Sequence, residues 1–303
     1  LESPKISKLD VDSITYDDKE GPKPAFEKFA KTNSITKLGI ESRTIRHLEL
    51  DLMNSTGITS DVVDASDIFA KLRMSKNSNE IDCMIKAVKI AETSLESVLD
   101  NIKPGLTEKQ FAADLVIELL RNGSDSELPF SPIVASGINA ANPHHFPSDK
   151  EFQYGELIII DWGANFEGYF SDITRTFALG SEIDDELLRA YEAVKQANES
   201  ARIKAKIGVQ AGMVDVAARK IIDDLGFGKL FTHRTGHGLG LEIHEEPYIK
   251  PGNDFILEKG MTFTIEPGIY IPNLGGIRIE DDIHLEESGA TSLTTLSREL
   301  ICL

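Results

Sequence analysis

The sequence predicts an α+β protein in which a small N-terminal α/β domain is followed by a larger, pseudo-symmetric domain. Three observations lead to this prediction: a change of pattern near residue 74, a helix motif that occurs twice, and two strand–turn–strand segments that carry acidic residues. A chain of 303 residues is long enough to build both domains around buried cores.

The composition narrows the classes of partner. A formal net charge of −18 argues against nucleic acid and anionic membranes, because both repel an acidic surface. No apolar run approaches the roughly 18 residues that a membrane span needs. The cysteines, Cys83 and Cys302, form no CxxC pair, so we expect a reducing compartment and therefore the cytoplasm.

Residues 1–74 are expected to form the small domain. The stretches ITKLGIE (35–41) and DVVDAS (61–66) are typical of strands, and TIRHLELDLMN (44–54) is typical of a helix between them. The chain begins LESPKISKLD, with neither an initiator Met nor a signal-peptide pattern, which indicates an incomplete N-terminus. We identify no catalytic candidate in this domain.

The larger domain, residues 75–303, opens with helical sequence. Apolar residues recur at helical spacing from Glu80 to Ile102, and Pro104-Gly105 ends this pattern. A capping box at Thr107 to Gln110 starts a second helix, which Gly123 ends. The domain is therefore expected to begin with two consecutive helices.

The second of these helices has a counterpart later in the chain. PGLTEKQFAADLVIELLRNG (104–123) aligns without gaps with IGVQAGMVDVAARKIIDDLG (207–226), at an offset of 103 residues. Two amphipathic helices can resemble each other by chance, but both stretches have glycine at the second and last positions, which favours an internal duplication. A duplicated domain has a seam between its halves, and ligands often bind at such seams.

The first acidic segment, LIIIDWGANFEGYFSDITRTF (157–177), predicts a β-hairpin with turn residues Asn165 and Gly168. The midpoint between Asp161 and Asp172 falls in the turn, between residues 166 and 167. A regular hairpin would therefore place these aspartates opposite each other, although directly opposed like charges destabilise a sheet.

The second acidic segment, TFTIEPGIYIPNLGGIRIEDD (262–282), repeats this arrangement. The midpoint between Glu266 and Glu280 is Asn273, so a hairpin would oppose two glutamates, unless Gly275-Gly276 introduces a bulge that shifts the register. Clustered carboxylates can lower their repulsion by taking up protons or by binding divalent cations. Oxygen ligands with an imidazole suit Mn, Co, Fe or Zn.

The stretch THRTGHGLGLEIHEEP (232–247) offers the imidazoles. His233, His237 and His244 are interleaved with glycines, which indicates a loop and strand whose backbone approaches something closely. Because Pro247 follows HEE and a second histidine is missing, this is not the HExxH helix of zinc proteases. His237, which is flanked by glycines, is the best ligand candidate.

Together, DWGANFEGYFSD, GHGLGLEIHEEP, TIEPG and GIRIED resemble the metallopeptidase family with the pita-bread fold, which contains methionine aminopeptidases, aminopeptidase P and Xaa-Pro dipeptidases (prolidases). The resemblance covers residues from about 75 to 303. It implies a site with two divalent metal ions in which a bridging hydroxide attacks the scissile carbonyl. It further implies short proline-containing peptides as substrates and a homodimer.

The resemblance also assigns roles. It implies that Asp161 and Asp172 bind one ion, that His237 and Glu266 bind the other, and that Asp172 and Glu280 bridge them. Glu266 is the implied proton acceptor, and His244 would stabilise the tetrahedral intermediate and hold substrate. Two histidines adjoin in GINAANPHHFPSD, and chemistry alone does not choose between His144 and His145. The resemblance assigns substrate contact to His144.

Strand alternation suggests which groups orient the carboxylates. It places Thr174 beside Asp172 and Arg278 beside Glu280, where both could fix the ligands in place. Simple alternation of polar residues in a sheet is the alternative.

Two features resemble the proline-directed branches rather than methionine aminopeptidase: His233 in HxxGHG and Arg278 two residues before Glu280. Both are implied to contact substrate. The short chain favours prolidase, with aminopeptidase P as the alternative. An N-terminal domain of about 74 residues is shorter than usual for these branches. Metal-free relatives such as creatinase and non-catalytic binding proteins share the fold but lack the five ligands that are present here.

Overall fold

The computed structural model describes residues 12–59 and 61–303, so the expectation about the first ten residues lies outside the described part. The chain divides into two compact units, residues 1–72 and 73–303. In the described part of the chain, no helix is both long and apolar enough to cross a membrane.

The small unit contains the two strands and the helix that the sequence predicts. Its two short strands pair in parallel, with Leu38 opposite Val62. It also contains one further helix that was not predicted, and a second such helix starts in this unit and ends at residue 74. The elements are α1 Lys23–Thr32, β1 Leu38–Ile40, α2 His47–Ser55, β2 Val62–Asp64 and α3 Ser66–Met74.

The larger unit alternates helix pairs with strands. Its helices are α4 Ser78–Val98, η2 Leu99–Asn101, α5 Glu108–Arg121, η3 Gly137–Ala141, α6 Asp185–Lys204, α7 Ala211–Asp224 and η4 Gly228–Leu230. Its strands are β3 Ile133–Ser136, β4 Glu156–Trp162, β5 Asn165–Phe166, β6 Tyr169–Phe170, β7 Ile173–Leu179, β8 Gly236–Gly238, β9 Glu245–Ile249, β10 Thr262–Ile265, β11 Gly268–Ile271, β12 Gly275–Arg278, β13 Asp281–Glu286, β14 Gly289–Ser292 and β15 Ile301–Cys302.

The predicted internal duplication is confirmed by these elements. Helix α5 begins at 108 and ends at 121, and α7 begins at 211 and ends at 224, so both bounds differ by 103. Gly105 and Gly208 precede the two helices, and all four paired glycines, including Gly123 and Gly226, have positive φ angles. Thr107 caps α5 with the predicted capping box, whereas Gln210 makes no side-chain cap to α7.

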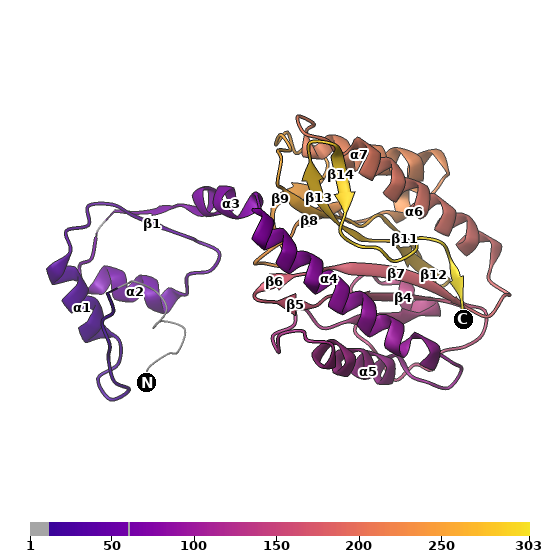
Figure 1. Cartoon of the computed structure of the whole chain (residues 1–303), viewed down its shortest axis with the longest axis horizontal. Helices are drawn as coiled ribbons and strands as arrows, with labels where there is room; N and C mark the ends of the chain where they lie inside the picture. Colours follow the sequence, from indigo (N-terminus) through magenta and orange to yellow (C-terminus); the bar gives the residue numbers. More distant parts are fainter. Residues whose placement is uncertain (1–11, 60) are drawn as a thin grey trace. The chain divides into compact units, whose positions relative to one another are not determined.

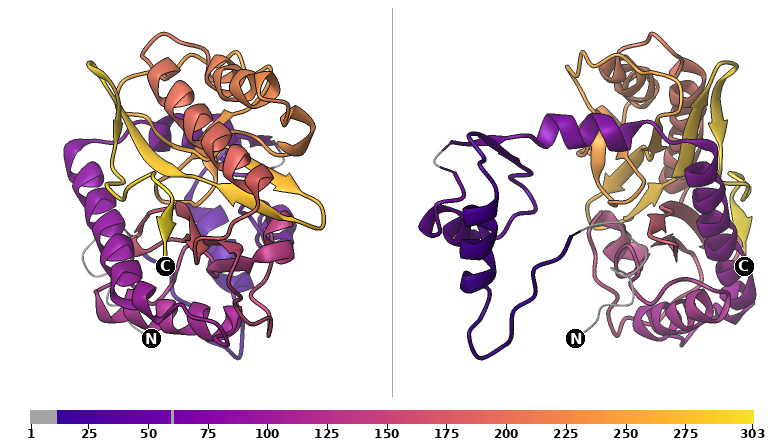
Figure 2. Two further views of the ribbon diagram at one scale, coloured as in Figure 1. Left: turned by 90° about the vertical axis from the view of Figure 1, so that its right-hand side faces the viewer. Right: turned by 60° about the vertical axis from the view of Figure 1, so that its left-hand side comes forward.

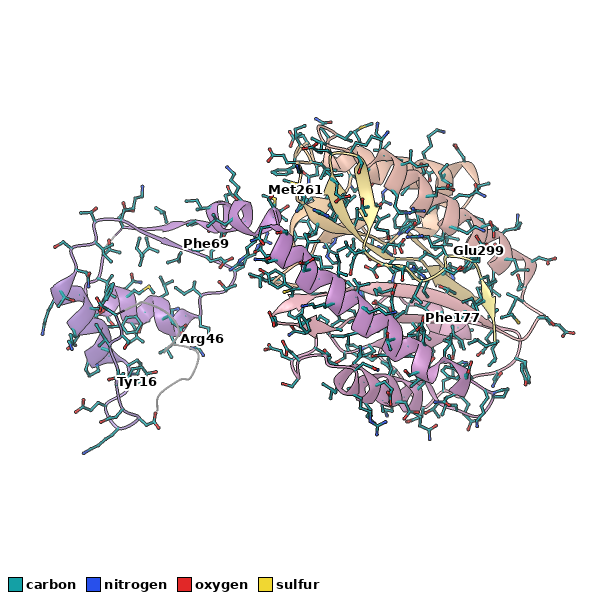
Figure 3. The ribbon with its side chains drawn as sticks, viewed as in Figure 1. Tyr16, Arg46, Phe69, Phe177, Met261 and Glu299 are labelled. Atoms are coloured by element: carbon teal, nitrogen blue, oxygen red, sulfur yellow. The ribbon has the colours of Figure 1, made fainter. Side chains whose placement is uncertain are left out.

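Each half contributes a sheet and a helix pair. One sheet has the strand order β15-β7-β4-β3 and the other β14-β13-β10-β8-β9. The α4–α5 pair lies on one side of the strands and the α6–α7 pair on the other (Figures 1 and 2). Apolar side chains fill the space between the layers, among them Phe177 of β7 (Figure 3), Trp162 and Phe111.

The first hairpin differs from the prediction by one residue in its turn. Asp161 lies opposite Thr174, so Asp172 is its diagonal neighbour and not its direct partner. The turn is centred on Glu167 and Gly168, both with positive φ, because the short strands β5 and β6 extend the ladder beyond Asn165. The prediction of directly opposed aspartates was therefore wrong, but diagonal neighbours on one face still lie within reach of each other.

The second hairpin has the predicted register. Gly268 lies opposite Arg278 in β11–β12, and Ile265 lies opposite Asp281 in β10–β13, so the same register continues through Glu266 and Glu280. Gly275 pairs with Ile271 in an unbroken ladder, without the bulge considered above. The two halves meet here, since the Glu280 N–H donates to the Thr174 carbonyl at 3.1 Å.

Candidate active site

The five predicted metal ligands come together at the seam between the halves. Asp161 and Asp172 come from the first half, and His237, Glu266 and Glu280 from the second. The His237 Nε2 atom lies 3.5 Å from Asp172 Oδ2 and 3.3 Å from Glu266 Oε1. Asp172, His237 and Glu280 each offer a ligand atom, and these atoms lie within 4.8 Å of one another. We call these five residues the cage.

Arg278 and Thr174 hold two cage carboxylates in place. Arg278 Nη2 donates to Asp161 Oδ2 at 2.7 Å, and its Nε donates to Thr174 Oγ1 at 3.1 Å. Thr174 Oγ1 in turn donates to Glu280 Oε2 at 2.6 Å. Thr174 therefore touches the carboxylate of Glu280, while Arg278 contacts Asp161 rather than its strand neighbour Glu280.

The four carboxylates of the cage have Arg278 as their ion-pair partner, and one cation does not balance four negative charges. Burial raises the pKa of Asp172 and Glu280 well above the usual range, and the neighbouring carboxylates raise both further. Burial raises the pKa of Glu266 to about 7 and also raises that of Asp161, which Arg278 only partly offsets. Like charges in a buried site favour protonation unless an external cation is present.

The chemistry of these groups fits divalent cations. Asp161 Oδ1 is buried and has no hydrogen-bond partner among the described residues. Burial lowers the pKa of His237 well below its ordinary value, so its imidazole stays neutral, which is the form that binds metals. Oxygen donors with one imidazole suit first-row divalent ions.

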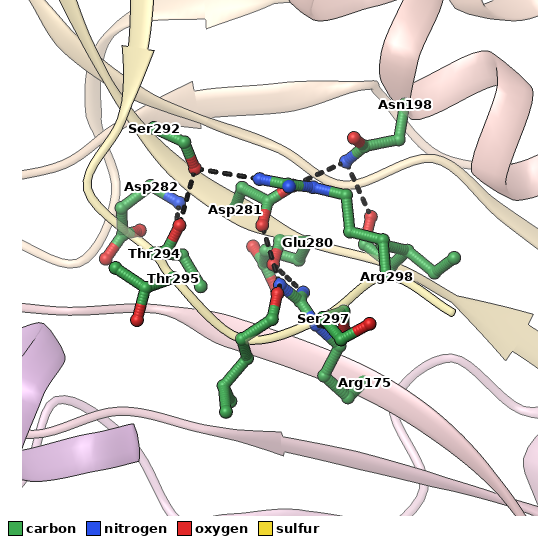
Figure 4. Close-up of polar contacts among 12 residues, drawn as sticks. Arg175, Asn198, Glu280, Asp281, Asp282, Ser292, Thr294, Thr295, Ser297 and Arg298 are labelled. Carbon is green, nitrogen blue, oxygen red and sulfur yellow. Dashed lines mark hydrogen bonds and ion pairs between the residues drawn. The ribbon is translucent and has the colours of Figure 1, made fainter. Parts of the chain in front are cut away.

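A buried network beneath the cage fixes the strand that carries Glu280 (Figure 4). Arg175 donates to the Glu280 carbonyl at 2.6 Å and to Asp281 Oδ1 at 2.8 Å. Asp281 Oδ2 also accepts from Arg298 at 2.7 Å and from Asn198 at 2.9 Å. Although burial alone would raise it, the pKa of Asp281 is lowered by the two arginines. The charge of the Asp281 carboxylate is thus balanced by two arginines of the same chain.

The remaining histidines of the 232–247 stretch lie beside the cage. The His244 ring packs edge-on against His237, with 4.3 Å between ring centroids. His233 Nε2 lies 2.8 Å from the Tyr270 hydroxyl, which accepts from Arg278 Nη1 at the same distance. Burial lowers the pKa of His233 to about 3, so this histidine is a neutral hydrogen-bonding group.

The two adjacent histidines, His144 and His145, have different hydrogen-bond partners. His145 Nε2 lies 2.8 Å from Glu108 Oε2, so this nitrogen already has a partner. His144 is exposed, and in the described part of the chain its ring has no hydrogen-bond partner. Both histidines line the cavity described next, and they differ in that the His145 ring is held by Glu108.

A cavity of about 660 Å³ opens over the cage. Its rim includes two cations, Arg234 and Lys250, that lie 4.9 and 5.6 Å from the centre of the Tyr248 ring. Among the residues that the structure describes, neither cation forms an ion pair with a carboxylate. The lining residues are Phe130, Ser131, Ile133, Pro143, His144, His145, Phe146, Asp161, Asp172, His233, Arg234, His237, Ile243, His244, Lys250, Glu266, Arg278 and Glu280.

Several supporting residues were missed by the sequence reasoning. The charged pair Asp281-Asp282 follows Glu280 inside a buried strand, which was a visible signal because buried acids need partners. Asp282 Oδ2 accepts the N–H of Asp172 at 3.1 Å. Tyr270 and Arg175 carried no such signal, since each becomes relevant only when distant segments pack together.

Comparison with known proteins places these features in context. A model of metallopeptidase family M24 matches residues 82–287. The Xaa-Pro dipeptidase of Pyrococcus furiosus is 39% identical over 284 residues, which are 92% of this chain and 81% of that protein. A dipeptidase structure from Pyrococcus horikoshii OT3 is 42% identical, with a TM-score of 0.92, and covers 99% of this chain and 83% of its own. An X-Pro aminopeptidase structure from Thermotoga maritima MSB8 is 34% identical, with a TM-score of 0.86 and coverages of 96% and 81%.

Proposed function

This chain belongs to metallopeptidase family M24 and has the pita-bread fold, and from that premise we propose that it is a prolidase, which hydrolyses Xaa-Pro dipeptides. The observation that carries the proposal is the cage, where four carboxylates and a neutral imidazole converge below a cavity. The Pyrococcus furiosus relative is named for this substrate, whereas the Thermotoga maritima structure is named for the alternative, release of an N-terminal residue from longer peptides.

Two divalent ions would be held by the cage. Asp161 and Asp172 would bind one ion, His237 and Glu266 the other, and Asp172 and Glu280 would bridge them. When bound, the ions would supply Lewis-acid polarisation of the scissile carbonyl and an acidified water. Manganese and cobalt are the first candidates, with zinc and iron next, because the ligand set accepts all four.

The protein's own groups would position the peptide and move protons. Glu266 has a carboxylate at the cavity floor and would accept the proton of the attacking water. His244, beside His237, would donate a hydrogen bond to the oxygen that becomes negative in the tetrahedral intermediate. His144 would contact the leaving amine from the opposite wall of the cavity.

Selection of proline would follow from the wall formed by His233 and Arg278, which the buried Tyr270 joins. These three side chains are tied together by hydrogen bonds and form a fixed surface. An Xaa-Pro bond has no N–H, so a site that depends on that donor cannot bind it well. A preformed wall recognises the substrate by shape instead.

The rim of the cavity favours a dipeptide over a longer peptide. Arg234 and Lys250 flank Tyr248 and have no carboxylate partner among the described residues, while the charge of Arg234 also lowers the pKa of His244, whose largest shift comes from burial. A dipeptide ends in a free carboxylate directly after the proline, and this group would gain a charge-assisted hydrogen bond at the rim. A tripeptide places a neutral amide there.

The test compares an Xaa-Pro dipeptide with an Xaa-Pro-Yaa tripeptide in the presence of Mn²⁺ or Co²⁺. We expect the dipeptide to be cleaved, and cleavage of the tripeptide alone would refute the prolidase assignment and favour aminopeptidase P. Arg234→Gln should raise KM for the dipeptide roughly tenfold, because a charged hydrogen bond is lost. The exposed Lys206→Gln is the matched control, for which no change is expected. Metal content of the purified protein checks the two-ion stoichiometry.

A homodimer and a cytoplasmic location complete the proposal. Both described cysteines are free thiols, as a reducing compartment requires. Light scattering of the purified protein checks the oligomeric state, and fractionation of the source cells checks the location.

A further inference from the structure

A buried carboxylate outside the cage holds both ends of the loop that carries His144. Glu108 is the first residue of α5, and its side chain is fully buried. Its Oε1 atom accepts from the Ser136 N–H at 2.8 Å and the Ser136 hydroxyl at 3.0 Å. Its Oε2 atom accepts from the Ser148 N–H at 3.0 Å and the Ser148 hydroxyl at 2.6 Å. One carboxylate thus ties residue 136 to residue 148.

Two side chains from within the loop reach the same carboxylate. Asn139 Nδ2 donates to both oxygens of Glu108, at 3.1 and 3.2 Å. His145 Nε2 lies 2.8 Å from Oε2. Because a carboxylate only accepts hydrogen bonds, His145 must carry a proton on Nε2. The loop is therefore fixed at its two ends and at two points between them.

The same loop lines the cavity. Pro143, His144, His145 and Phe146 all contribute to the lining. The Pro143 carbonyl accepts from Arg278 Nη1 at 3.3 Å, and Arg278 also holds Asp161 of the cage. The loop that carries His144 is consequently held by Glu108 and is also joined to the cage through Arg278.

The helix end that carries Glu108 is itself attached to the end of the loop. The Glu108 N–H donates to the Lys150 carbonyl at 3.0 Å, and the Lys109 N–H donates to the Ser148 carbonyl at 3.1 Å. The positive end of the 14-residue helix also stabilises the carboxylate charge. Loss of the carboxylate would leave several buried donors without a partner, which is strongly unfavourable.

We propose that Glu108 is a positioning residue for peptide hydrolysis. By binding His145 Nε2, it fixes that ring and leaves the ring of the adjacent His144 free for the substrate, and by joining Ser136 to Ser148 it sets the distance from His144 to the cage. This inference rests on the proposed function, since it assigns the geometry of the same reaction. Glu108 touches neither the cage nor the substrate and acts through His144.

A double-mutant cycle separates this role from a general effect on folding. Glu108→Gln should lower kcat about 10- to 100-fold with a smaller change in KM, because a misplacement of about 1 Å has effects of that size. In a His144→Ala background, the same substitution should lower kcat less than about twofold, because the residue through which it acts is gone. Losses that multiply in the double variant would overturn the proposal.

His145 provides a second pair of variants that leaves Glu108 intact. Gln can place an N–H near the position of Nε2, so His145→Gln should keep kcat within about threefold of the unmodified protein, whereas His145→Leu should match Glu108→Gln. Equal activity of the two His145 variants would contradict the assignment. This comparison decides the question even if Glu108→Gln does not fold.

Hydrogen exchange of the metal-free protein tests the inference without an activity assay. Amides of residues 137–147 should exchange roughly tenfold faster in Glu108→Gln, while α6 is unchanged. Glu118→Gln is the control on the same helix, because among the described residues the Glu118 carboxylate pairs only with the exposed Arg121. Unaltered exchange in the loop would refute the proposal. Failure of the unmodified protein to cleave Xaa-Pro peptides would refute the proposed function instead.

Discussion

Two sets of buried carboxylates lie within one residue of each other in this protein and have opposite electrostatics. Glu280 belongs to the cage, where burial and then the charges of Glu266 and Asp161 raise its pKa well above the usual range. Asp281 is the next residue and is equally buried, but Arg175 and Arg298 outweigh burial and lower its pKa. Strand alternation sends the two side chains to opposite faces.

The difference distinguishes a carboxylate that needs a bound cation or a proton from one whose charge is balanced by arginines of the same chain. A buried charge must be paired, protonated or bound to metal. Asp281 and Glu108 are satisfied by partners within the chain, and both hold backbone in place. The cage carboxylates crowd one another with Arg278 as their direct cation partner. Burial of a single acid therefore does not identify a metal site, whereas several buried acids that converge without enough internal cations favour one.

The largest expected effect is the loss of activity in Glu280→Gln. An amide of the same shape cannot bridge two cations, so metal-dependent cleavage of an Xaa-Pro dipeptide should fall by on the order of 10³-fold or more. The fold should persist, because the substitution removes like-charge repulsion. An assay with metal analysis and thermal unfolding of the metal-free variant checks both statements. Retained activity would show that Glu280 does not bridge two metal ions, and Glu280 could then no longer be contrasted with Asp281 as a metal ligand.

Asp281→Asn tests the other side of the comparison. The substitution leaves Arg175 and Arg298 buried without their carboxylate, so the free energy of unfolding should drop by about 3–5 kcal/mol. Urea unfolding of the metal-free protein measures this change. The exposed Glu286→Gln on the same strand is the control and should change stability by less than about 0.5 kcal/mol. If Asp281→Asn also changed the free energy of unfolding by less than about 0.5 kcal/mol, then burial of Arg175 and Arg298 would not require the charge of Asp281.

Much of the cage could be predicted because its signals are local. The spacing of Glu266 and Glu280 about Asn273 gives the second hairpin its register, and the paired glycines of the helix motif predict the duplication. The prediction for Asp161 and Asp172 was wrong in register because the length of the ladder beyond Asn165 depends on packing against other segments. Residue spacing gives the approximate position of a turn but not the last pair of its ladder.

The supporting residues could not be predicted from local pattern. Arg175 contacts Asp281 across 106 residues of sequence, and Glu108 contacts His145 across 37. Both are polar residues in otherwise ordinary amphipathic or alternating segments, and their partners are set by the assembled fold. The sequence therefore indicates the metal ligands, while the groups that hold those ligands in place require the three-dimensional arrangement.

The smallest expected effect is a pH dependence of stability that should differ between the two sets of carboxylates. An acid with a raised pKa keeps its proton in the folded protein after the unfolded chain has lost it, so stability falls as pH rises through this interval. Acids with a lowered pKa, such as Asp281, contribute stability that is lost only as pH falls below about 4. Histidines with a lowered pKa, such as His237, contribute stability that is lost only as pH falls below about 6.5. From about pH 6.5 up to and through the pKa of about 7 of Glu266, the cage should therefore dominate.

Thermal unfolding of the metal-free protein should consequently show a Tm that falls by on the order of 2–4 °C between about pH 6.5 and pH 7.5, since one pKa unit corresponds to about 1.4 kcal/mol. Saturating Mn²⁺ should abolish the slope, because cations replace the protons that the cage otherwise retains, and the Tm increase on adding metal should be largest at the upper pH. Glu280→Gln should flatten the slope without metal, because one crowded carboxylate is gone. A metal-free Tm that stays level or rises with pH would show that the cage carboxylates are already balanced within the chain, as Asp281 is, and the distinction between the two sets would fail.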